Sequence, residues 1–286
     1  MNFARSIFMA KKIIGSGDTT FEVIHPFGNL PWGWTYGNVS HVATDSKNNV
    51  YAFQRKDPPI LVFDKDGNFL TGWGQGILFD AHGIFISQED DIFLIDRDHH
   101  EVLKFNTNGE VIFRLGKRER PAFQAPFNHP TDIGVAPKSG DIYVSDGYGN
   151  SNVHRFSSEG KYLGSWGKPG DKPGEFTTPH AVWIDENEKV YIADRENNRI
   201  QIFSLEGDYI TEWRDLFHPM DIFQDEKGRF FVSDQIPRIS VFDSTGTLIA
   251  RGKTAANPHG IWGDKLGNLY GAGNEAGLTK YRKVVL

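Results

Sequence analysis

The stretch PHAVWIDENEKVYIADRENNRIQIF (residues 179–203) contains three short runs of β-forming residues separated by polar turns. The alternation of apolar and polar residues predicts strands over residues 181–184, 190–193 and 200–203. A further turn, over residues 204–207, precedes a fourth run that ends at Trp213. Four antiparallel strands joined by tight turns are the unit from which a β-propeller blade is built.

This unit recurs along the chain at intervals of about 40 to 50 residues, a period typical of propellers and solenoids. Five copies carry a phenylalanine followed four positions later by a glycine: Phe63/Gly67, Phe105/Gly109, Phe156/Gly160, Phe203/Gly207 and Phe242/Gly246. A sixth copy has Tyr281 in place of the phenylalanine, and the chain ends before its fourth strand. A β-like run at residues 20–24 is expected to supply the missing strand and close the ring, because closure removes exposed sheet edges. The sequence therefore predicts an all-β, six-bladed propeller with four-stranded antiparallel blades, forming one domain over residues 1–286.

Composition narrows the classes of function. The chain has no cysteine, which excludes disulfides and thiolate metal sites and fits a reducing compartment. Its net charge is −6 and its basic residues are scattered, so no nucleic-acid partner is expected. The first 15 residues lack the apolar core of a signal peptide, and no apolar run approaches a membrane span. We therefore expect a cytoplasmic protein that acts on a small molecule and has no membrane partner; its oligomeric state is open.

One residue per blade stands at the mouth of the first, innermost strand. In chain order these residues are His41, His82, Thr131, His180, Met220 and His259. Alternate blades of a six-bladed ring lie about 120° apart, so His82, His180 and His259 are predicted to face one another across the channel. Three histidines with a fourth position left open are the ligand set of a catalytic zinc site. Histidines that only form hydrogen bonds in a wet channel are the alternative. His41 breaks the threefold pattern and is not expected to bind the metal.

The turns after the second strands should surround this metal position, because successive strands run antiparallel. These turns carry Arg55, Arg97, Tyr148, Arg195, Gln235 and Asn274. Guanidinium groups at equivalent positions suit bidentate binding of a carboxylate. Alternatively, the arginines form inter-blade salt bridges with the aspartates that precede four of these turns: Asp96, Asp146, Asp194 and Asp234. Tyr148 is the one tyrosine in these turns and is a candidate general base.

Four motifs carry a resemblance to a known family. They are HPTDIGV (129–135), IYVSDGYGNS (142–151), GEFTTPHAV (174–182) and VYIADRENNRIQIF (190–203). The repeats resemble NHL repeats, and residues 127–203 are similar to the catalytic core of peptidyl-α-hydroxyglycine α-amidating lyase. The resemblance implies that zinc binds the three alternate-blade histidines, that Tyr148 is catalytic and that Arg195 belongs to the site. The implied reaction cleaves an N-acyl-α-hydroxyglycine to an amide and glyoxylate.

The chain departs from that family at two places. Residues 36–41 lack the arginine that the family has before the first-blade position, which leaves the substrate open. Gly260 replaces the aspartate that follows the last zinc histidine, which leaves the family's structural calcium open. Our hypothesis is a lyase, dependent on zinc or another divalent metal, that acts on a small carboxylated carbinolamide. Tyr148 would move the proton, and Arg195 with Arg55 or Arg97 would hold the carboxylate. The alternatives are a non-enzymatic NHL-type binding scaffold and a metal-dependent hydrolase such as a lactonase.

Overall fold

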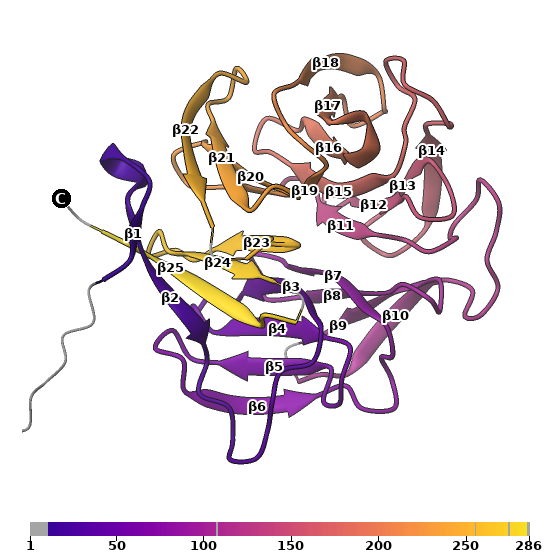
Figure 1. The fold of residues 1–286 in the computed structure, drawn as a ribbon. Coiled ribbons are helices and arrows are strands. Elements are labelled where there is room, and N and C mark those ends of the chain that lie inside the picture. Colours follow the sequence, from indigo (N-terminus) through magenta and orange to yellow (C-terminus); the bar gives the residue numbers. More distant parts are fainter. Residues whose placement is uncertain (1–10, 107, 255, 274, 285–286) are drawn as a thin grey trace, which may run out of the picture.

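Six β-sheets surround a central axis in the computed structural model, which describes residues 11–106, 108–254, 256–273 and 275–284 (Figure 1). Blade one contains β3 (Val39–Thr44), β4 (Val50–Gln54), β5 (Ile60–Phe63) and β6 (Phe69–Trp73). Blade two contains β7 (Ala81–Ile86), β8 (Ile92–Asp96), β9 (Glu101–Phe105) and β10 (Val111–Gly116). Blade three contains β11 (Asp132–Val135), β12 (Ile142–Asp146), β13 (Asn152–Phe156) and β14 (Tyr162–Trp166).

The other three blades repeat this order. Blade four contains β15 (Pro179–Ile184), β16 (Val190–Asp194), β17 (Arg199–Phe203) and β18 (Tyr209–Trp213), with the short 3-10 helix η2 (Arg195–Asn197) between its second and third strands. Blade five contains β19 (Pro219–Gln224), β20 (Phe230–Asp234), β21 (Arg238–Phe242) and β22 (Leu248–Lys253). Blade six contains β23 (Gly260–Gly263), β24 (Leu269–Ala272) and β25 (Leu278–Lys283). The first strand of each blade contacts that of the next, and β23 contacts β3, so the predicted six-bladed propeller is confirmed.

The N-terminal segment closes the ring as predicted. Strand β2 (Phe21–Phe27) pairs antiparallel with β25, placing Phe21 opposite Lys283 and Val23 opposite Tyr281. A short strand that the sequence did not predict, β1 (Ile13–Ile14), pairs with β2 and adds one more strand to this sheet. The 3-10 helix η1 (Gly17–Thr19) lies between β1 and β2 in the chain. Figure 1 shows the indigo N-terminal strands beside the yellow C-terminal strand. The last sheet is therefore held together by two distant parts of the chain.

Aromatic side chains hold neighbouring blades together. Trp166 and Trp213 end the fourth strands of their blades, and each packs on the repeat phenylalanine of the next blade. The centroid distances are 5.7 Å for Trp166 with Phe203 and 5.6 Å for Trp213 with Phe242. Such pairs add about 0.5–1.5 kcal/mol beyond the area they bury. Gly207 has a φ of +91°, and a Cβ there would lie 2.6 Å from the Trp166 ring, which explains the glycine of the repeat motif.

No helix among the described residues has the length and apolar character needed to cross a membrane. Residues 1–10, which belong to the segment tested for a signal peptide, lie outside the described part of the chain, and so does Asn274.

Candidate active site at the axis of the propeller

Three histidines from alternate blades meet at the axis. His82 lies in β7, His180 lies in β15 and His259 immediately precedes β23. One ring nitrogen of each lies within 4.8 Å of those of the other two. Their exposed fractions are only 1%, 2% and 8%. The structure thus brings together the three side chains that the alternation of blades predicted.

Each of these imidazoles is oriented by a backbone carbonyl of the neighbouring odd-numbered blade. Nδ1 of His82 contacts the carbonyl oxygen of Thr131 in a short hydrogen bond. Nδ1 of His180 lies 2.7 Å from the carbonyl oxygen of Met220, and Nδ1 of His259 lies 2.8 Å from that of Ser40. Because a carbonyl only accepts, Nδ1 carries the proton in all three rings. Each Nε2 therefore has a free lone pair.

The environment keeps the three rings neutral. Burial lowers the pKa of His259 to about 3, and the nearby charge of His41 acts in the same direction. Burial also holds the pKa values of His82 and His180 well below the usual range, with further lowering from the other ring histidines. Neutral imidazoles with their Nδ1–H groups donated to carbonyls are the form in which histidine binds metals.

Tyr148 stands directly over the histidines. Its hydroxyl oxygen lies 3.1 Å from Nε2 of His82 and 3.1 Å from Nε2 of His180. Nη1 of Arg195 donates to the same oxygen at 3.4 Å. The guanidinium carbons of Arg97 and Arg195 each lie 5.4 Å from the centre of the Tyr148 ring. The phenol therefore stands between the histidines and two cations, as the antiparallel order of the strands predicted.

Each arginine has a carboxylate beside its Nε, although the Nε–H of Arg55 donates to the carbonyl oxygen of Ala81 and that of Arg97 donates to Asp98. Asp80, in the loop before β7, lies between two of them: its carboxylate oxygens are 2.9 Å from Nε of Arg55 and 2.8 Å from Nε of Arg97. Nε of Arg195 lies 2.8 Å from Glu196. The arginines thus do form ion pairs, and the pair of Arg55 with Asp80 joins two blades. The partners are not the aspartates that precede the turns, which the sequence had suggested as an alternative.

The aspartates that precede the turns instead accept hydrogen bonds from backbone N–H groups. The carboxylate of Asp96 accepts hydrogen bonds from the backbone N–H groups of Phe79 and Asp80, and that of Asp194 accepts from Thr177. They fix the loops that lead into the first strands. Sequence reasoning missed Asp80 itself. The sequence could have indicated Asp80 by its position two residues before His82, in the loop that leads into β7.

These side chains line one cavity of about 730 Å³ on this face of the disc. The predicted residues that line it are Arg55, Arg97, Tyr148, Arg195, Gln235, Met220 and His259. The sequence did not single out three further polar residues of the lining, which are Asn38, Asn257 and Glu275. A cavity lined by three guanidiniums and the neutral imidazole of His259 suits a small ligand that carries a carboxylate.

His41 belongs to a different cluster. Its Nε2 lies 2.9 Å from Asp221 and 3.9 Å from Asp132, and all three residues are buried. Burial alone would lower the pKa of His41, but the charge and hydrogen bond of Asp221, the charge of Asp132 and the carbonyl of Val42 together outweigh it and raise that pKa to about 9. Burial raises the pKa of Asp132 to about 7. His41 is therefore part of a buried ion pair, in keeping with the expectation that it stands apart from the three other histidines.

Aromatic residues fill the channel further along the same strands. Phe85, Trp183 and Trp262 each stand three positions after one of the three site histidines. The Trp262 ring lies 5.4 Å from Phe85 and 5.6 Å from Trp183, between centroids. Phe223 joins them from blade five, 5.5 Å from Trp183. This layer separates the histidine site from the opposite face of the disc.

Known proteins that resemble this chain have the same propeller architecture. A family model described as "6-bladed beta-propeller" matches residues 131–242. The probable peptidyl-alpha-hydroxyglycine alpha-amidating lyase of Caenorhabditis elegans is 29% identical over 203 residues, covering 60% of this chain and 58% of the relative. NHL repeat-containing protein 3 of Homo sapiens is 32% identical over 226 residues, covering 72% of this chain and 65% of the relative. The protein is a six-bladed β-propeller with homologues among amidating lyases and NHL-repeat proteins.

The propeller corresponds to a small part of some relatives. The peptidylglycine alpha-amidating monooxygenase of Rattus norvegicus is 31% identical over 218 residues, which are 64% of this chain but 22% of the relative. This chain thus spans about a fifth of the length of that relative. Two solved structures share the fold at low identity. They are a gluconolactonase from Xanthomonas campestris (TM-score 0.71, 14% identity, 92% of this chain and 89% of that one) and virginiamycin B lyase from Staphylococcus aureus (TM-score 0.67, 12%, 93% and 100%).

Proposed function

We propose that this propeller is a metal-dependent lyase that cleaves the C–N bond of a small carboxylated carbinolamide, releasing an amide and glyoxylate. The observation that carries the proposal is the arrangement of His82, His180 and His259 beneath the hydroxyl of Tyr148. Relatives named as amidating lyases support the same reaction class.

The three histidines fit a zinc ion. Their rings are neutral, their Nδ1–H groups are used by carbonyls, and one nitrogen of each is within 4.8 Å of the others. Three imidazoles and one open position are the usual protein contribution to a catalytic zinc site. When bound there, zinc acts as a Lewis acid that makes an oxygen ligand more acidic. Zinc or a similar divalent metal is therefore the proposed cofactor.

Calcium does not fit at the position that the family resemblance suggests. Gly260 offers no side-chain ligand, and a Cβ on it would lie 2.7 Å from the imidazole ring of His41. The His41 ring thus fills the space that a longer side chain at position 260 would need. The nearby carboxylate of Asp221 is already paired with His41. Calcium prefers six to eight oxygen ligands, which this cluster does not offer.

Tyr148 is the group placed to move the proton. In the proposed reaction the substrate hydroxyl loses its proton, the C–N bond breaks as the carbonyl of glyoxylate forms, and the leaving amide nitrogen gains a proton. The Tyr148 hydroxyl, 3.1 Å from Nε2 of His82 and of His180, can pass the proton from the oxygen to the nitrogen. Atoms and charge then balance without another reactant.

The arginines hold the substrate carboxylate. Arg195 contacts the Tyr148 oxygen, and Arg97 lies across the same ring, so a carboxylate between them is next to the proton-transfer group. Asp80 forms ion pairs with Arg97 and Arg55, and the plane of each guanidinium is fixed by its Nε–H, which donates to Asp98 in Arg97 and to the Ala81 carbonyl in Arg55. A bound carboxylate in this position orients the α-carbon toward Tyr148.

The direct test is turnover of α-hydroxyhippurate by the zinc-loaded protein, with glyoxylate and benzamide both quantified. Equimolar formation of the two products is the expected result. Hippurate, which lacks the hydroxyl, is the matched control and should release neither. A zinc-loaded protein that releases no glyoxylate from any α-hydroxyglycine derivative would contradict the proposed reaction. Lactone hydrolysis in its place would favour the hydrolase alternative, which the gluconolactonase fold neighbour makes the first one to assay.

A further inference from the structure

A second cavity, of about 410 Å³, opens on the opposite face of the disc from the histidine site. Its walls include the last residues of four innermost strands, which are Thr44, Ile86, Gln224 and Gly263. His82 and His180 stand at the beginnings of their own innermost strands, β7 and β15. The aromatic layer of Phe85, Trp183 and Trp262 lies between the two ends. The second cavity is therefore separate from the proposed active site.

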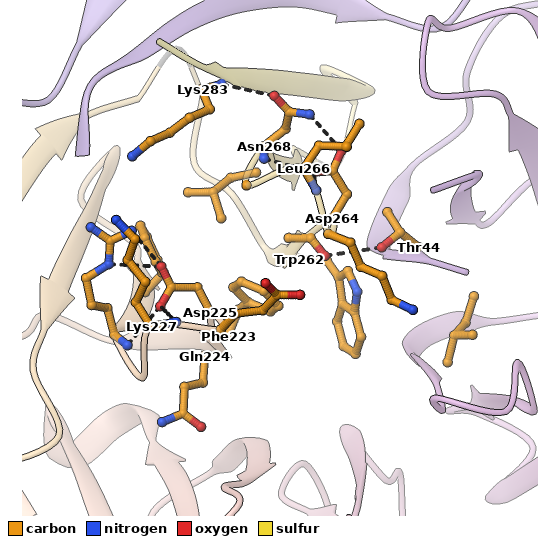
Figure 2. A pocket seen from close by; sticks show the side chains of 18 of the residues that line it. Thr44, Phe223, Gln224, Asp225, Lys227, Trp262, Asp264, Leu266, Asn268 and Lys283 are labelled. Carbon is orange, nitrogen blue, oxygen red and sulfur yellow. Dashed lines mark hydrogen bonds and ion pairs between the residues drawn. The ribbon is translucent and has the colours of Figure 1, made fainter. Parts of the chain in front are cut away.

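One wall of this cavity is apolar. Phe223, Phe231, Trp262 and Leu269 line it and are buried, and Leu266 lies at its edge with 56% of its surface exposed. Figure 2 shows Phe223 and Trp262 side by side, with Leu266 above them. Such a wall suits the apolar body of a small molecule.

The buried carboxylates of the lining are already satisfied by their own turns. Asp264 accepts hydrogen bonds from the backbone N–H of Leu266 and Asn268, from the Asn268 side chain and from the Tyr270 hydroxyl. Asp225 accepts from two backbone N–H groups and pairs with Arg229 through Nε and Nη2. These carboxylates have little capacity left for a ligand.

Three cations gather at one side of the cavity, among the carboxylates of Asp18, Asp225 and Glu226. Lys227 and Arg229 both reach the carboxylate of Asp18, and Arg229 also pairs with Asp225. Lys283 lies near this group on strand β25. Nζ of Lys283 is shielded from solvent, and among the described residues it has no hydrogen-bond partner. Burial lowers the pKa of Lys283, and the charge of Arg229 lowers it further.

A buried ammonium without a partner is costly unless an anion accompanies it. Nζ of Lys283 lies 5.3 Å from the centre of the Phe21 ring, which offers no hydrogen-bond acceptor of the usual kind. If the flexible Lys283 stem turns Nζ toward the cavity, a carboxylate bound there supplies the missing hydrogen-bond acceptor. An apolar body attached to it would extend along Phe223 and Trp262.

We propose that this cavity is a second binding site, which takes a small monocarboxylate with an aromatic or similarly bulky apolar body. Lys283 binds the carboxylate, and the wall formed by Phe223, Phe231 and Trp262 binds the body. The site is independent of the proposed lyase reaction, since none of its residues lies in the histidine cavity.

Isothermal titration with 3-phenylpropionate tests this site in the full-length protein. Propionate, which lacks the body, and 3-phenylpropanol, which lacks the charge, should each bind at least about tenfold more weakly. Lys283→Met keeps the aliphatic stem and should weaken 3-phenylpropionate by a similar factor. Lys253→Met, at an exposed position at the end of β22, is the matched control and should bind as the wild type. Removal of an unpaired buried charge should not lower the melting temperature of Lys283→Met.

Arg55, Arg97 and Arg195 of the histidine cavity are unchanged in Lys283→Met. If this variant binds 3-phenylpropionate as tightly as the wild type, the ligand binds in the histidine cavity and the proposal is overturned. Equal binding of 3-phenylpropionate, propionate and 3-phenylpropanol overturns it as well. Crystals soaked with 3-(4-bromophenyl)propionate give an independent readout. We expect bromine anomalous density beside Phe223 and Trp262; bromine density only beside Arg97 and Arg195 would contradict the site.

Discussion

The hydroxyl oxygen of Tyr148 lies 3.1 Å from Nε2 of His180. The same oxygen is equally close to His82, although Tyr148 comes from a turn in blade three and the histidines come from blades four and two. A group that stands so close to the proposed metal ligands, without being needed to hold them, is suited to proton transfer. This separation of tasks makes the site testable by substitution.

Tyr148→Phe should lower turnover of α-hydroxyhippurate by about 10²- to 10⁴-fold, the usual contribution of a general acid or base. The phenylalanine keeps the ring that lies against Arg97 and Arg195, so folding should be unchanged. Zinc content and melting temperature, measured on the same preparation, are the controls. An unimpaired Tyr148→Phe enzyme would show that another group moves the proton.

Alanine at His82, His180 or His259 should remove most of the zinc, because two imidazoles seldom hold the metal that three hold. The wild type should contain about one equivalent of metal per chain, as measured by elemental analysis. His41→Ala is the matched control: its side chain pairs with Asp221 and should not be required for metal binding. Full occupancy in His180→Ala would rule out the axial site.

Asp80→Asn should raise KM by about tenfold while zinc content stays the same. The Asp80 carboxylate forms ion pairs with both Arg55 and Arg97, so neutralising it removes the charge that holds the two guanidiniums side by side and lets them move away from the substrate. If Asp80 acted on the substrate only through its negative charge, KM would fall instead, because removing that charge would strengthen the attraction of the site for the substrate carboxylate. Steady-state kinetics separates the two, and Asp66→Asn, at a solvent-exposed turn, is the control.

His41→Ala should lower the free energy of unfolding by about 3–5 kcal/mol, the cost typical of breaking a buried ion pair. The substitution leaves Asp221 and Asp132 buried without their cation. Urea unfolding of the metal-free protein measures this loss without the contribution of bound metal. A midpoint equal to that of the wild type would mean that water replaces the lost partner.

The charge state of His41 gives a separate pH prediction. Because its pKa in the folded protein is raised to about 9, its stabilising effect is complete below the ordinary imidazole value of about 6.5. The effect is lost as the pH rises through about 9. The imidazole resonance of His41 in NMR spectra of the metal-free protein should therefore titrate near that pH. A midpoint near 6.5 would contradict the proposed charge state.

Deletion of residues 1–27 should leave β25 with an unpaired edge. Strand β2 supplies the outer partner of β25 from Phe21 to Phe27, so its loss exposes backbone groups and uncovers Tyr281. We expect aggregation or a large fall in melting temperature. Light scattering and thermal melting provide the measurement. A truncated protein that melts like the full chain would show that closure of the ring contributes little to stability.

The sequence by itself determined the number of blades, the closing strand and the three axial histidines. These features repeat with a fixed period or stand at equivalent positions in each repeat, so local pattern is enough to place them. The glycine four residues after Phe203 is an example: its positive φ recurs in all five copies of the motif, and in each copy a Cβ would meet an apolar side chain of the neighbouring blade.

Only the tertiary structure decided how these residues are held. Asp80 pairs with Arg55 and His41 pairs with Asp221, both across blade boundaries. Neither of these contacts follows from a repeat, because each depends on one blade having a residue that its neighbours lack. The cavity beside Lys283 is of the same kind. It arises where blade five meets the blade that β2 and β25 complete, and the lack of a partner for a buried ammonium becomes apparent only when its surroundings are assembled.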